Sequence, residues 1–124
     1  MQLRECYAAF GGDYDSVSDR IPKTEIIEMF LIKFLSEPSY GNLCEAIENE
    51  RYEEAFREAH SLKGVSANLG FKVLGKSSSD LTEYLREKSS NQIDSVKCKE
   101  LLEKVSGDYR VVIDAIKEFR GPAD

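Results

Sequence analysis

The sequence predicts an all-α fold, an antiparallel four-helix bundle with additional short helices at its N-terminus. Apolar residues recur at three- and four-residue intervals along most of the chain, as on one face of a helix. No run of β-branched residues alternates with polar ones between turns, so strand signals are absent. The connections are short, which favours antiparallel neighbours. A chain of 124 residues can bury one core. We expect a single domain over residues 1–124, with the bundle at about 36–119 and an N-terminal helical segment at about 2–35.

Two short helices are expected at the start of the N-terminal segment. The first covers residues 2–9, and the Gly11-Gly12 pair stops it. Asp13 can then cap a short helical turn that runs to Arg20, and the proline two residues later breaks that turn.

A third helix is expected over residues 25–35, with Thr24 as its N-cap. Its apolar residues recur at helical spacing: Ile26, Ile27, Phe30, Leu31, Phe34 and Leu35. Met29 and Ile32 widen this apolar surface. We therefore expect the helix to be covered on more than one side.

Four further helices make up the expected bundle, over about 38–50, 52–69, 71–88 and 95–119. Gly70 stands where a helix C-terminal glycine belongs. Asp94 or Ser95 can cap the last helix. Gly75 and the serines at 77–79 weaken helix propensity, but such small residues allow a neighbouring helix to approach closely.

The composition excludes several classes of function. Acidic residues outnumber basic ones by 23 to 17, for a net charge of -6, and no basic stripe of a nucleic-acid binder appears. Apolar runs such as residues 29–32 are far too short to span a bilayer, and the chain opens without a secretory signal. Cys6, Cys44 and Cys98 lack C-x-x-C spacing, and one histidine offers too few nitrogen ligands for a metal. We therefore expect a cytoplasmic protein with reduced thiols, no metal, and neither nucleic acid nor membrane as partner.

The only histidine lies in the segment AHSLKGVSANLG, residues 59–70. Residues three and four apart share a surface patch on a helix, so His60, Lys63 and Gly64 are expected side by side. A step of about 100° per residue from the core stripe puts His60 at the edge of the buried face. There Phe56, one turn earlier, can support the imidazole ring.

The presence of a glycine at position 64 requires an explanation, because glycine inside a helix costs up to about 1 kcal/mol of stability relative to alanine. A closely approaching backbone, from the same chain or from a partner, would supply one. Gly64 and Ala67 also leave the C-terminal side of the imidazole uncovered.

An exposed imidazole is nucleophilic through one ring nitrogen. Lys63 can place its ammonium beside an anion formed there, and a phosphoryl group, with close to two negative charges, suits that lysine. No second histidine, catalytic triad or glycine-rich phosphate loop supports another chemistry. On spacing alone, a merely solvated surface histidine stays the alternative.

Residues 59–70 resemble the signature of histidine-containing phosphotransfer (Hpt) domains, roughly A-H-x-L-K-G-x-[AS]-x-x-[LF]-G. Eight of the twelve positions match: Ala59, His60, Leu62, Lys63, Gly64, Ser66, Leu69 and Gly70. Similarity extends over nearly the whole chain, through Ala46, Ile47, Tyr52, Ala55, Leu74, Leu81 and Leu85, and through the early Gly12-Asp13 and Arg20-Ile21 pairs.

The resemblance implies a monomeric four-helix bundle in which His60 is the phosphoacceptor and Lys63 stabilises the phosphoryl charge. The domain would pass a phosphoryl group between aspartates of receiver domains, from hybrid histidine kinases and response regulators. It would be a phosphotransfer intermediate rather than an autonomous kinase, with no cofactor of its own and Mg²⁺ supplied by the receiver. Phe56, Arg57, Gly64 and Ala67 would then contact the partner.

One departure from the family concerns the imidazole ring. Some members place a long polar side chain on the following helix, hydrogen-bonded to the histidine. The nearest residues here, Ser78, Ser79 and Thr82, are short. The sequence therefore names no group that orients the His60 ring.

Two alternatives stay open. A helical adaptor would dock receivers without taking phosphate, as family members lacking the histidine do. A dimerising histidine kinase module would carry an acid after the histidine, where Ser61 stands here, and needs an ATP-binding domain for which the chain has no room. We expect a stand-alone protein, with a fragment of a hybrid kinase as the alternative.

Overall fold

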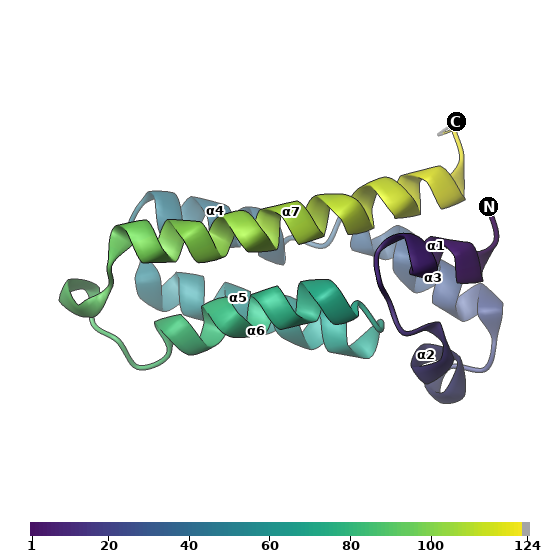
Figure 1. Cartoon of the computed structure of the whole chain (residues 1–124), viewed down its shortest axis with the longest axis horizontal. Coiled ribbons are helices and arrows are strands. Elements are labelled where there is room, and N and C mark those ends of the chain that lie inside the picture. Colours follow the sequence, from purple (N-terminus) through teal and green to yellow (C-terminus); the bar gives the residue numbers. More distant parts are fainter. Residues whose placement is uncertain (123–124) are drawn as a thin grey trace.

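The computed structural model describes residues 1–122, and these residues form helices and no strand. The elements are α1 (Leu3–Ala9), α2 (Tyr14–Arg20), α3 (Thr24–Phe34), α4 (Ser39–Glu48), α5 (Tyr52–Asn68), α6 (Lys72–Leu85), the 3₁₀ turn η1 (Ser90–Gln92) and α7 (Ser95–Arg120). The predicted all-α class is confirmed (Figure 1). No helix in the described part of the chain is both long enough and apolar enough to cross a membrane.

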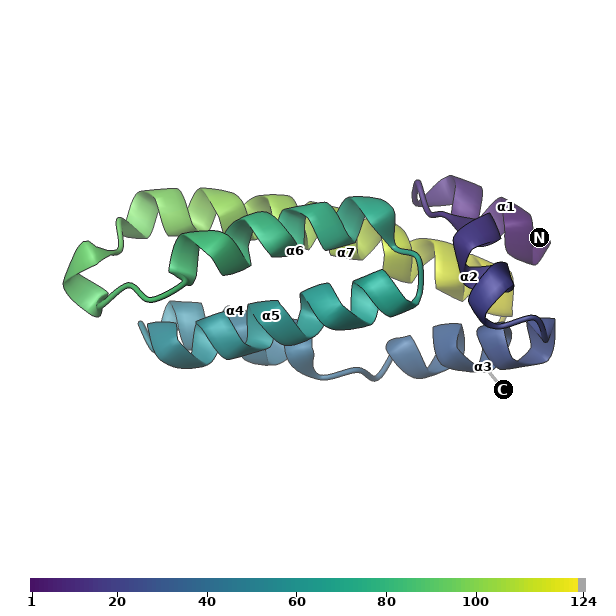
Figure 2. The same ribbon diagram turned by 90° about the horizontal axis from the view of Figure 1, so that it is seen from below.

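The four later helices pack as the predicted bundle. α5 packs against α4 and α6, and α6 packs against α7. α7 is the longest element and extends beyond the bundle, where α1 and α3 pack against it. Figures 1 and 2 show α1, α2 and α3 grouped at that end, with the C-terminal end of α7 beside them. The short N-terminal helices therefore cover one end of the bundle, as predicted.

Aspartate side chains cap the starts of α2 and α7. The Asp13 carboxylate accepts a hydrogen bond from the Ser16 amide (3.1 Å), and Asp94 accepts from the Val96 amide (2.9 Å). Thr24 is not the N-cap of α3, contrary to the prediction. The helix begins one residue earlier, because the Lys23 carbonyl already accepts from the amides of Ile26 and Ile27.

α3 is covered on one side only, so the prediction of cover on several sides was wrong. Ile27, Leu31 and Phe34 are buried, whereas Met29 is 45% exposed and Ile26 and Ile32 are exposed as well. α3 lies at the end of the molecule, where α2 and α7 are its neighbours. Too few elements reach this end to cover a second face.

An aromatic cluster joins the N-terminal segment to the bundle. The ring of Phe71, at the start of α6, lies 5.0 Å from that of Phe10 and 4.9 Å from that of Phe34, both edge-on. Tyr7 is buried beside them, 4.9 Å from Phe10. The three N-terminal helices therefore share one hydrophobic core with the bundle.

The same N-terminal segment holds the C-terminal end of α5 through long-range hydrogen bonds. The Tyr7 hydroxyl donates to the Leu69 carbonyl (2.7 Å), and the Asp13 amide donates to the Gly70 carbonyl (2.9 Å). The Arg20 guanidinium donates to the carbonyls of Ala67 (3.2 Å) and Asn68 (2.8 Å). Helices end with unsatisfied carbonyls, and these donors satisfy them. Gly70 adopts φ +73°, which confirms it as the helix-terminating glycine.

Candidate functional site

His60 lies on the exposed face of α5, with its ring against Phe56. The two ring centroids are 6.0 Å apart and the planes are nearly parallel, at 12°. The His60 side chain is exposed and Phe56 is half-buried. The predicted support of the imidazole by the residue one turn earlier is therefore present, and an incoming group can reach the ring from solvent.

The surface on the C-terminal side of His60 is open. A Cβ placed on Gly64 would find no neighbouring atom within 4 Å, and Ala67 is exposed. Within residues 1–122, no helix packs against the bare backbone of Gly64, so packing among the described residues does not account for this glycine.

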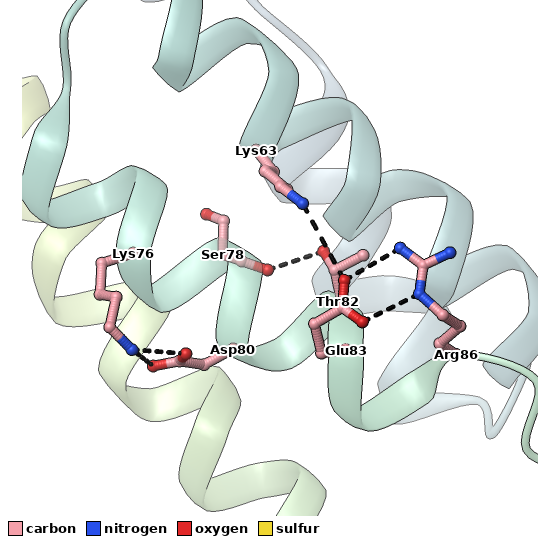
Figure 3. Close-up of polar contacts among 7 residues, drawn as sticks. All are labelled: Lys63, Lys76, Ser78, Asp80, Thr82, Glu83 and Arg86. Carbon is pink, nitrogen blue, oxygen red and sulfur yellow. Dashed lines mark hydrogen bonds and ion pairs between the residues drawn. The ribbon is translucent and has the colours of Figure 1, made fainter.

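Lys63 is paired with an acidic residue of the neighbouring helix. Its ammonium lies 4.0 Å from Oε1 of Glu83 on α6. Glu83 also accepts two hydrogen bonds from Arg86, one from Nε and one from Nη2, each 2.9 Å long. Figure 3 shows the Glu83 carboxylate between the lysine and the arginine.

Arg86 connects this carboxylate back to the histidine. Its guanidinium carbon lies over the ring of Phe56, 5.2 Å from the centroid, and Phe56 in turn stacks on His60. The contacts therefore run from His60 through Phe56, Arg86 and Glu83 to Lys63, and the two ends of this series lie one turn apart on α5. We call these five residues the charge ring.

The electrostatics of the charge ring keep Glu83 ionised. The hydrogen bonds from Arg86 are the main cause that holds the pKa of the Glu83 carboxyl below its usual range. The nearby positive charges of Arg86, Lys63 and His60 act in the same direction. At neutral pH the site therefore contains two fixed cations and one fixed carboxylate beside the imidazole.

Of the short polar residues of α6 nearest the motif, Ser78 and Thr82 are buried in the core and Ser79 is half-buried. Thr82 is buried, and its hydroxyl donates to the Ser78 carbonyl of its own helix (2.7 Å; Figure 3). The small side chains of α6 allow close packing, and α5 and α6 form the most extensive helix pair. A Cβ on Gly75 would lie 3.6 Å from that of Ser66, an ordinary contact. The predicted close approach of a neighbouring helix is confirmed.

Two other residues near His60 have partners away from the charge ring. Arg57 is exposed and lies 3.8 Å from Glu53 of its own helix. The Ser61 hydroxyl accepts a hydrogen bond from Ser39 at the start of α4 (3.0 Å). Ser61 therefore contributes to helix packing, and Arg57 stays at the margin of the site.

Sequence reasoning missed Glu83 and Arg86. The signal available was an acidic and a basic residue three apart on the helix after the motif, which is a common surface pattern. Only the packing of α6 on α5 brings these two residues beside Lys63 and Phe56. Within residues 1–122, no group of three or more histidine, cysteine, aspartate or glutamate side chains is placed to hold a metal ion.

Comparison with protein families matches the model described as Hpt domain to residues 26–116. The chain belongs to the Hpt domain family. Hpt domains take part in phosphorelay signalling and pass phosphoryl groups to receiver domains. The matched range contains the whole charge ring and excludes α1 and α2. Neither the curated proteins nor the solved structures contain a significant match to this Hpt domain.

Proposed function

We propose that His60 accepts a phosphoryl group from a receiver-domain aspartate and passes it to an aspartate of another receiver domain. The observation that carries this proposal is the exposed imidazole of His60, held against Phe56 with Lys63 one turn away. Family membership supplies the kind of partner. The chain acts in this proposal as a carrier and not as a kinase.

The chemistry requires little from the Hpt domain itself. A neutral imidazole nitrogen attacks the phosphorus of the aspartyl phosphate, a P–N bond forms, the P–O bond to the aspartate breaks, and the carboxylate leaves. The onward step is the reverse, with the aspartate of the second receiver as nucleophile. Lys63 stabilises the negative charge of the phosphoryl group in both states. The receiver is expected to bring Mg²⁺.

The open surface defines where a receiver would dock. A protein interface of ordinary size covers about 800 Å² on each partner. Phe56 and Ala67 are separated by about 16 Å along α5, at 1.5 Å per residue, so one such interface spans both. Gly64 lies between them and lets the partner approach the helix backbone. Arg57 would contact the rim of this interface.

The test is transfer from a receiver domain phosphorylated on its aspartate, measured by loss of the receiver's label and its gain by this chain. We expect wild type to become labelled and His60→Gln to stay unlabelled. Lys63→Ala should slow transfer about tenfold or more, since an interaction with a charged group is worth about 1.5–3 kcal/mol.

The matched control is Lys76→Ala, because Lys76 is an exposed lysine of α6 whose partner is Asp80, not Glu83. This variant should transfer at the wild-type rate. Equal labelling of wild type and His60→Gln would contradict the proposal. A wild-type chain that binds cognate receivers yet never takes label would instead be the docking adaptor.

A further inference from the structure

We propose that Glu83 competes with the phosphoryl group for Lys63, so that phosphorylation of His60 opens the charge ring at the contact between Lys63 and Glu83. Glu83 would then be a positioning residue, acting through Lys63 and lowering the affinity of the site for the phosphoryl group. This inference rests on the proposed function of His60. It adds a residue that sets how readily the phosphoryl group leaves.

The two contacts of Glu83 differ in how easily they can open. The Lys63 ammonium lies 4.0 Å from the carboxylate, at the outer limit of an ion pair, and the Glu83 side chain is 55% exposed. The lysine side chain has a flexible stem of four carbons, so the ammonium can move from Glu83 to an anion on His60. Arg86 instead binds the carboxylate with two short hydrogen bonds and is held over Phe56.

The charges decide the direction of the change. In the unphosphorylated domain, Lys63 and Arg86 together face one carboxylate. A phosphoryl group adds close to two negative charges a few atoms away, and Lys63 then interacts more favourably with it than with Glu83. The remaining carboxylate repels the phosphoryl group. Glu83 therefore favours the phosphoryl-free state of His60.

Both the attraction and the repulsion act at an exposed site, so the expected effect is moderate. Exposed charge pairs change an equilibrium constant by a factor of about two to five. Replacing Glu83 by glutamine, which keeps the shape and removes the charge, should shift the phosphoryl equilibrium towards His60 by about that factor.

Asp80 provides a matched control on the same helix. Its carboxylate accepts from Lys76 at 2.7 and 2.9 Å, and it borders a recess that Lys104 and Asp108 of α7 also line. In Figure 3 the Lys76–Asp80 pair lies apart from the Lys63–Glu83–Arg86 cluster. Asp80→Asn therefore removes the same charge from α6 without touching the charge ring.

The first experiment uses phosphoramidate, a small anionic donor that phosphorylates histidine without a receiver. Its P–N bond breaks, ammonia leaves and a P–N bond to the imidazole forms. In ¹⁵N-labelled wild-type protein we expect the Lys63 Nζ resonance to shift when His60 is phosphorylated, because the ammonium exchanges Glu83 for the phosphoryl group. Initial labelling should be about two- to five-fold faster in Glu83→Gln and unchanged in Asp80→Asn. Circular dichroism verifies that both variants fold.

A Lys63 resonance that does not move, or equal labelling rates in Glu83→Gln and Asp80→Asn, would overturn the competition by Glu83. The second experiment measures the equilibrium of label between a receiver and each variant. A shift of about two- to five-fold towards the chain only in Glu83→Gln supports the proposal, and an equal shift in both variants refutes it. If no receiver transfers label at all, the proposed function fails, while the phosphoramidate result still decides the role of Glu83.

Discussion

Gly64 allows stability and function to be separated by a single methyl group. A Cβ at this position meets no atom within 4 Å, so Gly64→Ala should not strain the fold. The substitution should instead stabilise α5 by about 0.5–1 kcal/mol, since alanine loses less backbone entropy than glycine in a helix. In a chain of this length the melting temperature should rise by about 2–5 °C.

The same methyl should impair transfer. It would project into the surface that a docked receiver is proposed to contact, and overpacking a fitted interface costs about 1–3 kcal/mol. Transfer from a phosphorylated receiver should therefore be about fivefold slower or more. Thermal unfolding followed by circular dichroism, together with the labelling assay, measures the two effects on one sample.

Gly107→Ala is the control for both effects. Gly107 is an exposed glycine within α7, and a Cβ there also meets nothing within 4 Å. It should gain the same stability and transfer at the wild-type rate. A Gly64→Ala variant that transfers as fast as wild type would refute Gly64 as the point of approach, and a lower melting temperature would refute the open geometry.

Two further predictions concern the stability of the fold. Gly70→Ala should destabilise the protein by about 2–5 kcal/mol, because the residue has φ +73° and the new methyl would overlap Val17 and lie 2.9 Å from the Asp13 carbonyl oxygen. Urea unfolding measures this loss, and Gly75→Ala is the control because its methyl makes only an ordinary contact. Burial raises the pKa of the Cys6 thiol to about 11, from an ordinary value of 9.0. The unfolded chain therefore loses this proton first, and stability should fall between pH 9 and 11 by up to about 1.4 kcal/mol per pH unit from this group. The same slope of unfolding free energy in Cys6→Ala would show that this thiol does not contribute.

Local spacing predicted those features of the site that depend on one helix. The stacking of His60 on Phe56, one turn apart, follows from helical geometry alone, and so do the shared surface of His60 and Lys63 and the terminating role of Gly70. The functional roles of these residues stay predictions until transfer is measured.

Features that depend on how two elements pack could not be predicted from the sequence. Glu83 approaches Lys63, and Arg86 approaches Phe56, only because of the rotation of α6 against α5, which no spacing within one segment specifies. Met29 is a second example, because its apolar side chain was expected to be covered and is exposed. An apolar stripe indicates what a helix can bury, whereas the number of neighbouring elements decides what it does bury.

The hydrogen bonds from the N-terminal segment to the end of α5 mean that the structural unit is larger than the family range. A segment of residues 26–116, transplanted into another protein, would lose Tyr7, Asp13 and Arg20 as donors to the last carbonyls of α5. It would also leave one face of Phe71 without its aromatic neighbour Phe10. The unit that keeps these contacts therefore begins at the first helix. A transplanted domain would need to include residues 1–25.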